Sequence, residues 1–163
     1  MSKNKLKRFA DIARFSNVYE LTDFQDNGKQ KPKGKWRTEI FKNDQPLILE
    51  LACGRGEYTL ELARRNPENN YVGIDIKGAR IWKGAKGALN EGLTNVRFLR
   101  IYIDHLDEYF TFGEVDQIWI TFPDPYLKVR KKSKRLSSPK FLNIYRRVLK
   151  PGGVIHFKTD SDS

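Results

Sequence analysis

The chain has 163 residues and a mass of 19.0 kDa, which suits one domain with a buried core. No apolar run approaches the ~20 residues needed to cross a bilayer, and no apolar segment follows the basic start of the chain as a secretory signal would require. The single cysteine, Cys53, excludes an intramolecular disulfide and a cysteine-built zinc site, and two histidines leave little room for a histidine-built one. We therefore expect a cytoplasmic protein without a metal.

The charge balance is strongly basic. Lys and Arg total 31 against 20 for Asp and Glu, which gives a net charge of +11 and a pI near 9.8. Such a balance favours a polyanionic partner, with nucleic acid ahead of an anionic membrane surface. The charge is also clustered, because the stretch from Pro125 to Lys150 holds ten basic residues and no acid.

The first 45 residues are predicted to form a basic N-terminal extension. Residues 5–15 have the apolar spacing of a short helix, and residues 25–35 are polar and contain Gly and Pro, as loops and linkers do. Two interpretations stay open for this extension. It is either an unstructured tail or a basic arm that becomes ordered on RNA.

From Pro46 to Ser163, strands and helices are predicted to alternate in a regular way. This alternation is typical of right-handed βαβ units and a mainly parallel sheet, so we expect an α/β, Rossmann-like, doubly wound fold. The predicted strands are 47–51, 71–75, 96–101, 115–122 and 154–158, and the predicted helices are 57–65, 78–91, 105–110 and 138–149.

A glycine turn follows the first of these strands. Glu50 ends the strand, and Gly54 and Gly56 follow it in a turn where the missing side chains allow a ligand to approach the backbone. The turn is not a dinucleotide fingerprint, because Thr59 stands where that motif has Gly or Ala and a carboxylate would repel a pyrophosphate. A carboxylate beside the turn suits a cationic ligand, the amino group and sulfonium of S-adenosylmethionine. Asp75, at the end of the next strand, is placed to accept the ribose hydroxyls.

A rigid acidic loop follows the fourth strand. In the sequence Phe-Pro-Asp-Pro-Tyr of residues 122–126, two prolines fix the backbone around Asp124. A carboxylate held beside a methyl donor can accept hydrogen bonds from a nucleobase, and the basic run that begins directly afterwards can bind phosphates. This order of groups favours base chemistry within a structured RNA.

These motifs together resemble the bacterial tRNA (guanine-N7)-methyltransferases. The segments that carry the resemblance are 50–56, 73–75, 122–136 and 156–160, and the acidic loop with its basic tail is the most specific of them. The resemblance implies a class I methyltransferase that uses S-adenosylmethionine to modify guanine N7 at position 46, in the variable loop of tRNA. It implies Asp124 as the catalytic residue, Glu50 and Asp75 as cofactor contacts, and Lys128 and Asp160 as substrate contacts. From the residues themselves we add further contacts, to the cofactor Gly54, Gly56 and Tyr102, and to the substrate Arg130, Lys131, Lys134 and Arg135.

The sequence also departs from the family pattern. Tyr126 replaces a usual Trp, Leu127 a usual Pro, and Tyr102 stands where the family often has Asp or Asn near the adenine, with Asp104 close by. The family also continues well beyond Asp160. We therefore expect the last strands of the fold to be missing, residues 154–157 to form an exposed apolar edge, and this form to have little or no activity.

Two other functions remain open, an exocyclic-amine methyltransferase and a non-catalytic RNA-binding module on the same fold. The protein is expected to be a monomer or homodimer. Cys53 is interpreted as a small residue that fits the turn, and His105 as a solvent-facing residue. His156 and Trp119 are expected to be structural. Trp36 and Trp82 are left as either core residues or stacking surfaces for RNA.

Overall fold

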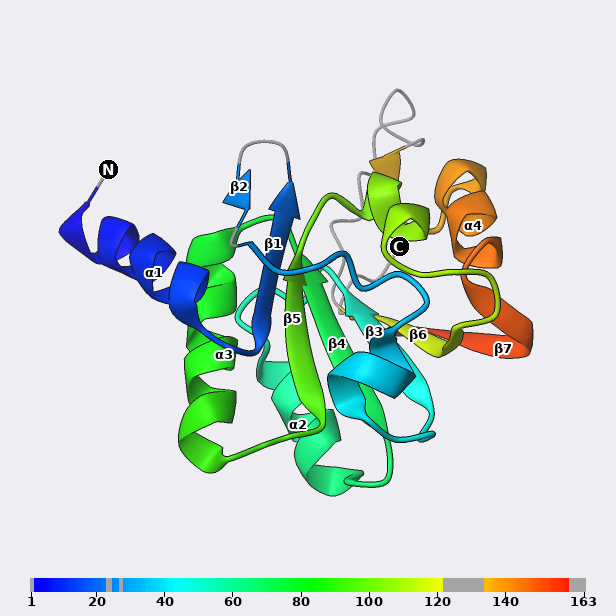
Figure 1. Cartoon of the computed structure of the whole chain (residues 1–163). Helices are drawn as coiled ribbons and strands as arrows, with labels where there is room; N and C mark the ends of the chain where they lie inside the picture. The colour runs from blue at the N-terminus through cyan, green and yellow to red at the C-terminus, as the bar shows by residue number, and fades with distance from the viewer. Residues whose placement is uncertain (1, 23–24, 27, 122–133, 159–163) are drawn as a thin grey trace.

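The computed structural model describes residues 2–22, 25–26, 28–121 and 134–158. Their strands form one seven-stranded sheet in the spatial order β2-β1-β5-β4-β3-β6-β7 (Figure 1). All neighbouring strands are parallel except β1 and β2, which pair antiparallel. The predicted α/β fold with a mainly parallel sheet is therefore confirmed. The strands are β1 (Val18–Thr22), β2 (Gln25–Asp26), β3 (Leu47–Leu51), β4 (Asn70–Asp75), β5 (Val96–Arg100), β6 (Val115–Thr121) and β7 (Leu149–Lys158).

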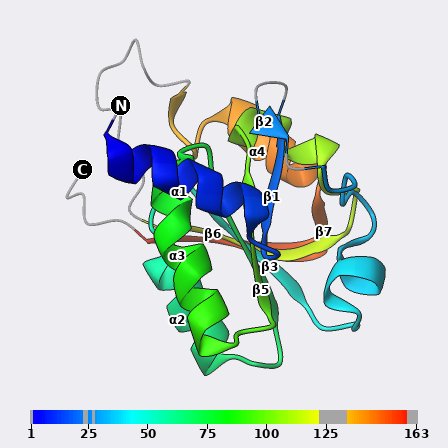
Figure 2. The same cartoon turned by 60° about the vertical axis from the view of Figure 1, so that its left-hand side comes forward.

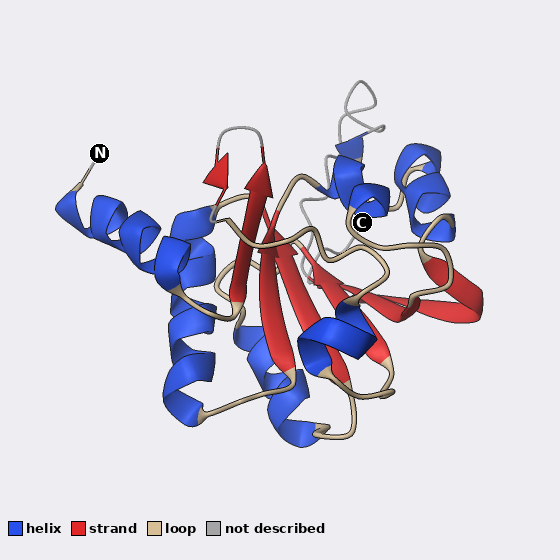
Figure 3. Cartoon of the chain, in the orientation of Figure 1, coloured by secondary structure: helices blue, strands red, loops and turns tan. Residues whose placement is uncertain are grey.

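Helices cover both faces of this sheet (Figure 3). One face carries α1 (Lys3–Arg14), α2 (Glu57–Arg65) and α3 (Gly78–Glu91), and the other carries α4 (Pro139–Arg146) with the short helices η1 (Trp36–Phe41) and η2 (Ile103–Glu108). Each face has its own apolar core. Because β3 lies between the two cores, all five of its residues are buried, as expected for a central parallel strand.

The N-terminal segment is part of the same sheet. Strand β1, which the sequence did not predict, pairs in parallel with β5. Ile12 of α1 and Val18 of β1 are fully buried, and the buried carboxylate of Glu20 forms an ion pair with Arg100 across β1 and β5 at 3.0 Å. In the described residues, this segment therefore packs against the rest of the sheet and its helices.

Most other predicted elements occur with small shifts at their ends. Helices α2 and α3 have the predicted bounds. The helix predicted over 138–149 is shorter, because the chain has already entered β7 at Leu149 and the sequence Lys-Pro-Gly-Gly lies within that strand, beside a register shift relative to β6. The short helix predicted over 105–110 is the 3-10 helix η2, two residues earlier.

Strand β7 lies at the edge of the sheet. Val154 and Phe157, which point to opposite faces of the strand, are 46% and 48% exposed. The expected exposed apolar edge is therefore confirmed. Within the described residues, no helix combines the length and the apolar character that a membrane span requires.

Candidate functional site

The candidate site lies where the direction of the chain through the sheet reverses. From β3 the chain adds β4 and β5 on one side, and it then returns to add β6 and β7 on the other side (Figure 1). In open α/β sheets, ligands bind at such a switch point, outside the carboxyl ends of the strands. Glu50 near the end of β3 and Thr121 at the end of β6 come together there.

The turn after β3 has an unusual backbone. Ala52, Gly54 and Gly56 have φ angles of 55°, 58° and 73°, so three residues within five adopt the left-handed conformation. Gly56 begins α2 as its N-cap, and its backbone N–H donates to the carbonyl of Cys53 at 2.9 Å. The turn therefore reverses the chain tightly between strand and helix, which is the feature predicted from the glycines.

The two glycines have different surroundings. A Cβ atom on Gly54 would meet no heavy atom within 4 Å, so this part of the turn is open to a ligand. A Cβ atom on Gly56 would lie 2.8 Å from Cε1 of Phe98 and 3.2 Å from Cα of Gly84 in α3. Gly54 therefore leaves space for a ligand beside the turn, whereas Gly56 allows the turn to pack closely against α3.

Asp75 connects the end of β4 to the glycine turn. Its Oδ2 accepts a hydrogen bond from the backbone N–H of Gly54 at 2.9 Å, and its Oδ1 accepts one from that of Lys77 at 2.8 Å. The side chain remains partly exposed. Since a carboxylate has about four acceptor positions, it retains acceptor capacity for a ligand's hydroxyl groups.

Glu50 is buried beneath the same turn, with 2% of its surface exposed. Its Oε1 accepts a hydrogen bond from the hydroxyl of Thr59, and its Oε2 accepts one from the hydroxyl of Thr121. Burial raises the pKa of Glu50, and the negative charge of Asp75 contributes in the same direction, whereas the threonine hydrogen bonds oppose the shift. The site therefore concentrates acidic groups and is suited to a ligand that carries positive charge.

The sequence did not identify Thr59 and Thr121 as parts of this site. Thr59 stands out in the sequence only because it replaces a glycine of the dinucleotide motif, and Thr121 only as a strand residue. Thr59 is fully buried and Thr121 is 6% exposed, and each hydroxyl donates to Glu50. A hydroxyl-bearing residue in the first turn of α2 is the signal that would have indicated such a contact.

The end of β5 contributes Tyr102 and Asp104. Tyr102 directly precedes η2 and is 50% exposed, so its ring is available at the carboxyl edge of the sheet. Asp104 forms an ion pair with Lys140 of α4 at 2.8 Å, and this hydrogen bond lowers the pKa of Asp104. Both side chains are exposed, but Asp104 is engaged by α4, whereas Tyr102 presents an exposed ring at this position.

Several predicted site residues lie outside the described part of the chain. They are Asp124, Lys128, Arg130, Lys131 and Asp160. Of the remaining predicted substrate contacts, Lys134 is exposed and Arg135 is partly buried, just before α4. Their roles stay predictions.

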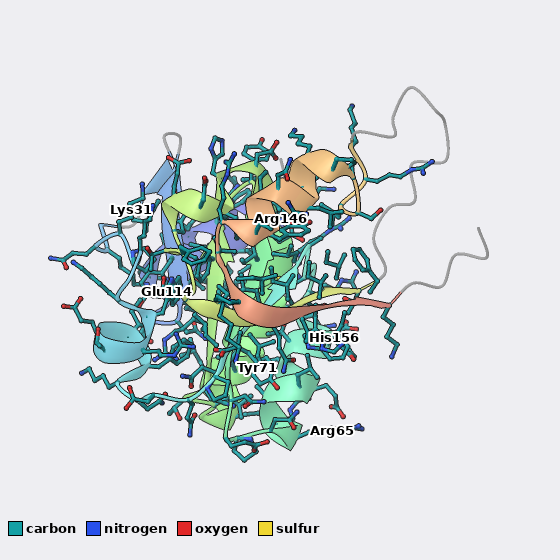
Figure 4. All side chains as sticks on the ribbon, turned by 90° about the vertical axis from the view of Figure 1, so that its right-hand side faces the viewer. Lys31, Arg65, Tyr71, Glu114, Arg146 and His156 are labelled. Atoms are coloured by element: carbon teal, nitrogen blue, oxygen red, sulfur yellow. The ribbon has the colours of Figure 1, made fainter. Side chains whose placement is uncertain are left out.

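The structure agrees with the expectations for Cys53 and for the two histidines. Burial raises the pKa of Cys53 well above its ordinary value, so its thiol stays protonated, in agreement with the interpretation that it fits the turn. His156 of β7 stacks on Trp119 of β6, with ring centroids 4.1 Å apart; Figure 4 labels His156. His105 faces solvent and pairs with Glu108 at 2.6 Å.

The structure distinguishes the two tryptophans whose roles the sequence left open between core residue and stacking surface for RNA. Trp36 is fully buried and stacks on Phe110 with a centroid distance of 5.0 Å, so it is a core residue. Trp82 of α3 is only partly buried, and its side chain contacts α1.

Comparison with protein families and sequences gives a consistent result. A family model described as "Putative methyltransferase" matches residues 44–163. The chain is 52% identical over 163 residues to a tRNA (guanine-N(7)-)-methyltransferase of Christiangramia forsetii, covering 99% of this chain and 72% of the relative. It is 50% identical to the enzyme of the same name from Bacteroides thetaiotaomicron, covering 99% of this chain and 64% of the relative. The chain thus spans about two thirds of the length of these relatives.

Solved structures show the same fold at low sequence identity. A 16S rRNA (adenine(1408)-N(1))-methyltransferase from Catenulisporales acidiphilia aligns with a TM-score of 0.63 at 19% identity, covering 86% of this chain and 61% of that one. The antibiotic-resistance methyltransferase Kmr aligns with a TM-score of 0.60 at 20% identity, covering 76% and 66%. Both similarities concern the fold.

Proposed function

Because the chain belongs to the family of tRNA (guanine-N(7)-)-methyltransferases, we propose that it transfers a methyl group from S-adenosylmethionine to N7 of a guanine in tRNA. The guanine at position 46 of the variable loop is the proposed target. The observation that carries the proposal is the pair of carboxylates, Glu50 and Asp75, on either side of a glycine turn at the switch point of the sheet.

The geometry of the turn fits S-adenosylmethionine. The space beside Gly54 allows a ligand to lie against the backbone, and the partly exposed carboxylate of Asp75 suits the two ribose hydroxyls. The negative field of Glu50 and Asp75 favours the positively charged amino group and sulfonium of the molecule. Gly54 and Gly56 form the turn, and Tyr102 offers an exposed ring for the adenine at the neighbouring strand end.

The proposed reaction makes few demands on acid–base chemistry. Guanine N7 has a lone pair and no proton, so the protein does not need a general base to create the nucleophile. S-adenosylmethionine supplies the methyl group: the S–CH3 bond breaks as the N7–CH3 bond forms, S-adenosylhomocysteine remains, and the positive charge passes to the purine. The protein's task is therefore to hold N7 in line with the methyl group and at close distance.

The substrate contacts of this proposal follow the family motif. Asp124 orients the guanine by accepting hydrogen bonds from the N–H groups of the base, and it stabilises the positive charge that develops on the ring. The tRNA is held by Lys128, Arg130, Lys131, Lys134, Arg135 and Asp160. We place the reaction in the cytoplasm and propose a monomer or homodimer as the working form.

The test is transfer of a tritiated methyl group from S-adenosylmethionine to unmodified tRNA. We expect this activity from a version extended at the C-terminus to the length of the relatives, and little or none from residues 1–163. Nuclease digestion and mass spectrometry of the product should locate the methyl group on guanine N7. Asp124→Ala should abolish transfer and leave binding of S-adenosylmethionine nearly unchanged.

Other outcomes would replace the proposal. A methyl group on an exocyclic amine would assign the chain to a different class of nucleic-acid methyltransferase. If calorimetry detects tRNA binding but no binding of S-adenosylmethionine by either version, the protein is a non-catalytic RNA-binding module. Full turnover by Asp124→Ala would remove that residue from its catalytic role.

A further inference from the structure

Helix α1 is fixed on α3 by a specific polar contact. The indole N–H of Trp82 in α3 donates a hydrogen bond to Oδ2 of Asp11 in α1 at 2.8 Å. Ile12 of α1 is fully buried against the same helix, close to Gly78. Figure 2 shows α1 crossing the first turns of α3, and Figure 1 shows the start of α1 on the side toward which the parallel strands point.

Two cations from different helices share the indole ring at this junction. The guanidinium carbon of Arg8 in α1 lies 4.6 Å from the centroid of the Trp82 ring, and Nζ of Lys86 in α3 lies 4.8 Å from it. Attraction to the aromatic ring favours both positive charges at this position, each within about 5 Å of the ring centroid. The junction is therefore a preorganised positive site.

The acids near this junction are already engaged. Asp11 accepts hydrogen bonds from Trp82 and Arg14, and Glu91 at the end of α3 pairs with Arg64 of α2 at 2.6 Å. Helix α1, the N-cap of α3 and the first turns of α3 carry further exposed cations: Lys3, Lys5, Lys7, Lys77, Arg80 and Lys83. Among these, only Lys83 has an ion pair in the described part of the chain, with Glu57 of α2 at 3.9 Å.

We propose that this α1–α3 surface, formed by Arg8, Lys86 and the exposed cations around them, binds the phosphate backbone of the substrate RNA. The inference rests on the proposed function and adds a second contact region, apart from the basic run that follows Asp124. Helix α1 has 12 residues and is about 18 Å long at 1.5 Å per residue, so the surface can contact several successive phosphates. Arginine and lysine contacts of this kind position an RNA without reading its sequence.

The chemistry of the surface favours RNA over a membrane. An amphipathic helix that binds lipid needs a broad apolar face turned outward. In α1 the apolar residues Phe9 and Ile12 are turned inward, and only Leu6 among its large apolar side chains is strongly exposed, at 55%. The outward surface is dominated by cations, which suits a hydrated polyanion.

The test compares two variants that each remove three positive charges. The surface variant is Lys7→Gln/Arg8→Gln/Lys86→Gln. The control is Lys33→Gln/Lys42→Gln/Arg65→Gln, three exposed residues outside both the α1–α3 surface and the basic run that follows Asp124; Figure 4 labels Arg65. The dissociation constant for unmodified tRNA is measured at several salt concentrations, together with binding of S-adenosylmethionine and the thermal midpoint.

We expect the surface variant to bind tRNA at least ~10-fold more weakly at low salt. Its slope of log affinity against log salt should be smaller by about 0.7 to 0.9 for each phosphate that the variant no longer binds, whereas the control should keep nearly the slope of the unaltered chain. Binding of S-adenosylmethionine should be unchanged in both. Equal slopes in the two variants would overturn the inference and leave the proposed function standing.

Two further results would also count against this surface. A surface variant that binds tRNA normally but no longer binds vesicles containing phosphatidylglycerol would assign the surface to a membrane. Absence of tRNA binding by both the unaltered chain and its extended form would overturn the inference together with the proposed function. These two results can be distinguished, because tRNA methylation stays intact if the surface binds a membrane.

Discussion

The carboxylate of Asp75 accepts a 2.9 Å hydrogen bond from the backbone N–H of Gly54. This bond joins two segments that are 21 residues apart in sequence, the end of β4 and the turn after β3. One residue thus shapes the glycine turn and also presents the acceptor proposed for the ribose. Changes at Asp75 should therefore affect both the fold and the affinity for S-adenosylmethionine.

Asp75→Asn is expected to weaken binding of S-adenosylmethionine by about 10- to 100-fold. Gly54 and Lys77 donate to different oxygens of Asp75, and the amide replaces one of these oxygens by an NH2 donor, so one of the two hydrogen bonds is lost. Hydrogen bonds to a charged group contribute about 1.5–3 kcal/mol each. Calorimetry measures the affinity. The exposed Asp44→Asn is the matched control and should bind normally. Unchanged affinity in Asp75→Asn would show that the ribose is held elsewhere.

Glu50→Gln should make the protein more stable at neutral pH. Burial raises the pKa of Glu50 in the folded state. Between its unfolded pKa and this raised value, the folded state binds more protons than the unfolded state, so stability is lost as the pH rises through the folded pKa. Gln carries no charge, and the hydroxyls of Thr59 and Thr121 can act as either donors or acceptors.

The stability of Glu50→Gln should therefore depend less on pH than that of the unaltered chain. Urea unfolding across the range from acid to neutral pH should give similar stability for both proteins at the acid end and a growing advantage for the variant toward neutral pH. The same variant should bind S-adenosylmethionine more weakly, because the site loses negative charge. Parallel pH profiles for the two proteins would show that Glu50 does not carry this dependence.

Glu20→Ala should destabilise the fold by about 3–5 kcal/mol, since it removes the carboxylate from a buried ion pair with Arg100. Replacing both residues by Leu should recover much of this loss, because apolar residues can replace a buried ion pair at little cost. Urea denaturation measures both variants. A small effect of the single change would mean that β1 contributes little to the stability of the sheet.

The alternation of elements from Pro46 onward was predictable because each apolar run is short and is followed by a helical repeat or a turn residue. The core strands and the bounds of α2 and α3 follow from these local patterns. Strand β1 was not predictable in the same way, since residues 18–22 mix charged and apolar side chains. Glu20 is buried there with Arg100, 80 residues away, as its ion-pair partner.

The candidate site was predictable at the strand ends and not beneath them. Glu50, Gly54 and Asp75 stand out because parallel strands bring their carboxyl ends to one edge. The partners Thr59 and Thr121 depend on side-chain directions that no local pattern specifies. The junction of Trp82 with Asp11 likewise joins residues 71 positions apart, so the sequence left Trp82 open between core and surface.

Gly84→Ala should destabilise the protein and displace the glycine turn. The added Cβ would lie 2.7 Å from the carbonyl oxygen of Arg55, which belongs to that turn. The free-energy cost of overpacking, about 1–3 kcal/mol, should exceed the gain in helix propensity from Gly to Ala, about 1 kcal/mol. Gly87→Ala is the matched control on the same helix, because its Cβ meets only a flexible end of Leu60 at 3.3 Å. The control should be neutral or stabilising, and only Gly84→Ala should bind S-adenosylmethionine more weakly.

Ala52→Gly should stabilise the fold by up to about 1 kcal/mol. Ala52 has a φ of 55°, a conformation that costs a residue with a Cβ about 1–2 kcal/mol. Glycine avoids this cost, but it loses more backbone entropy on folding, which offsets about 0.5–1 kcal/mol of the gain. Ala52→Val should be destabilising, because a β-branched side chain tolerates this φ poorly. Urea unfolding measures both variants. A loss of stability in Ala52→Gly would show that the turn is not strained at this residue, and that the shape of the binding turn is held by Gly54, Gly56 and the carboxylate of Asp75 alone.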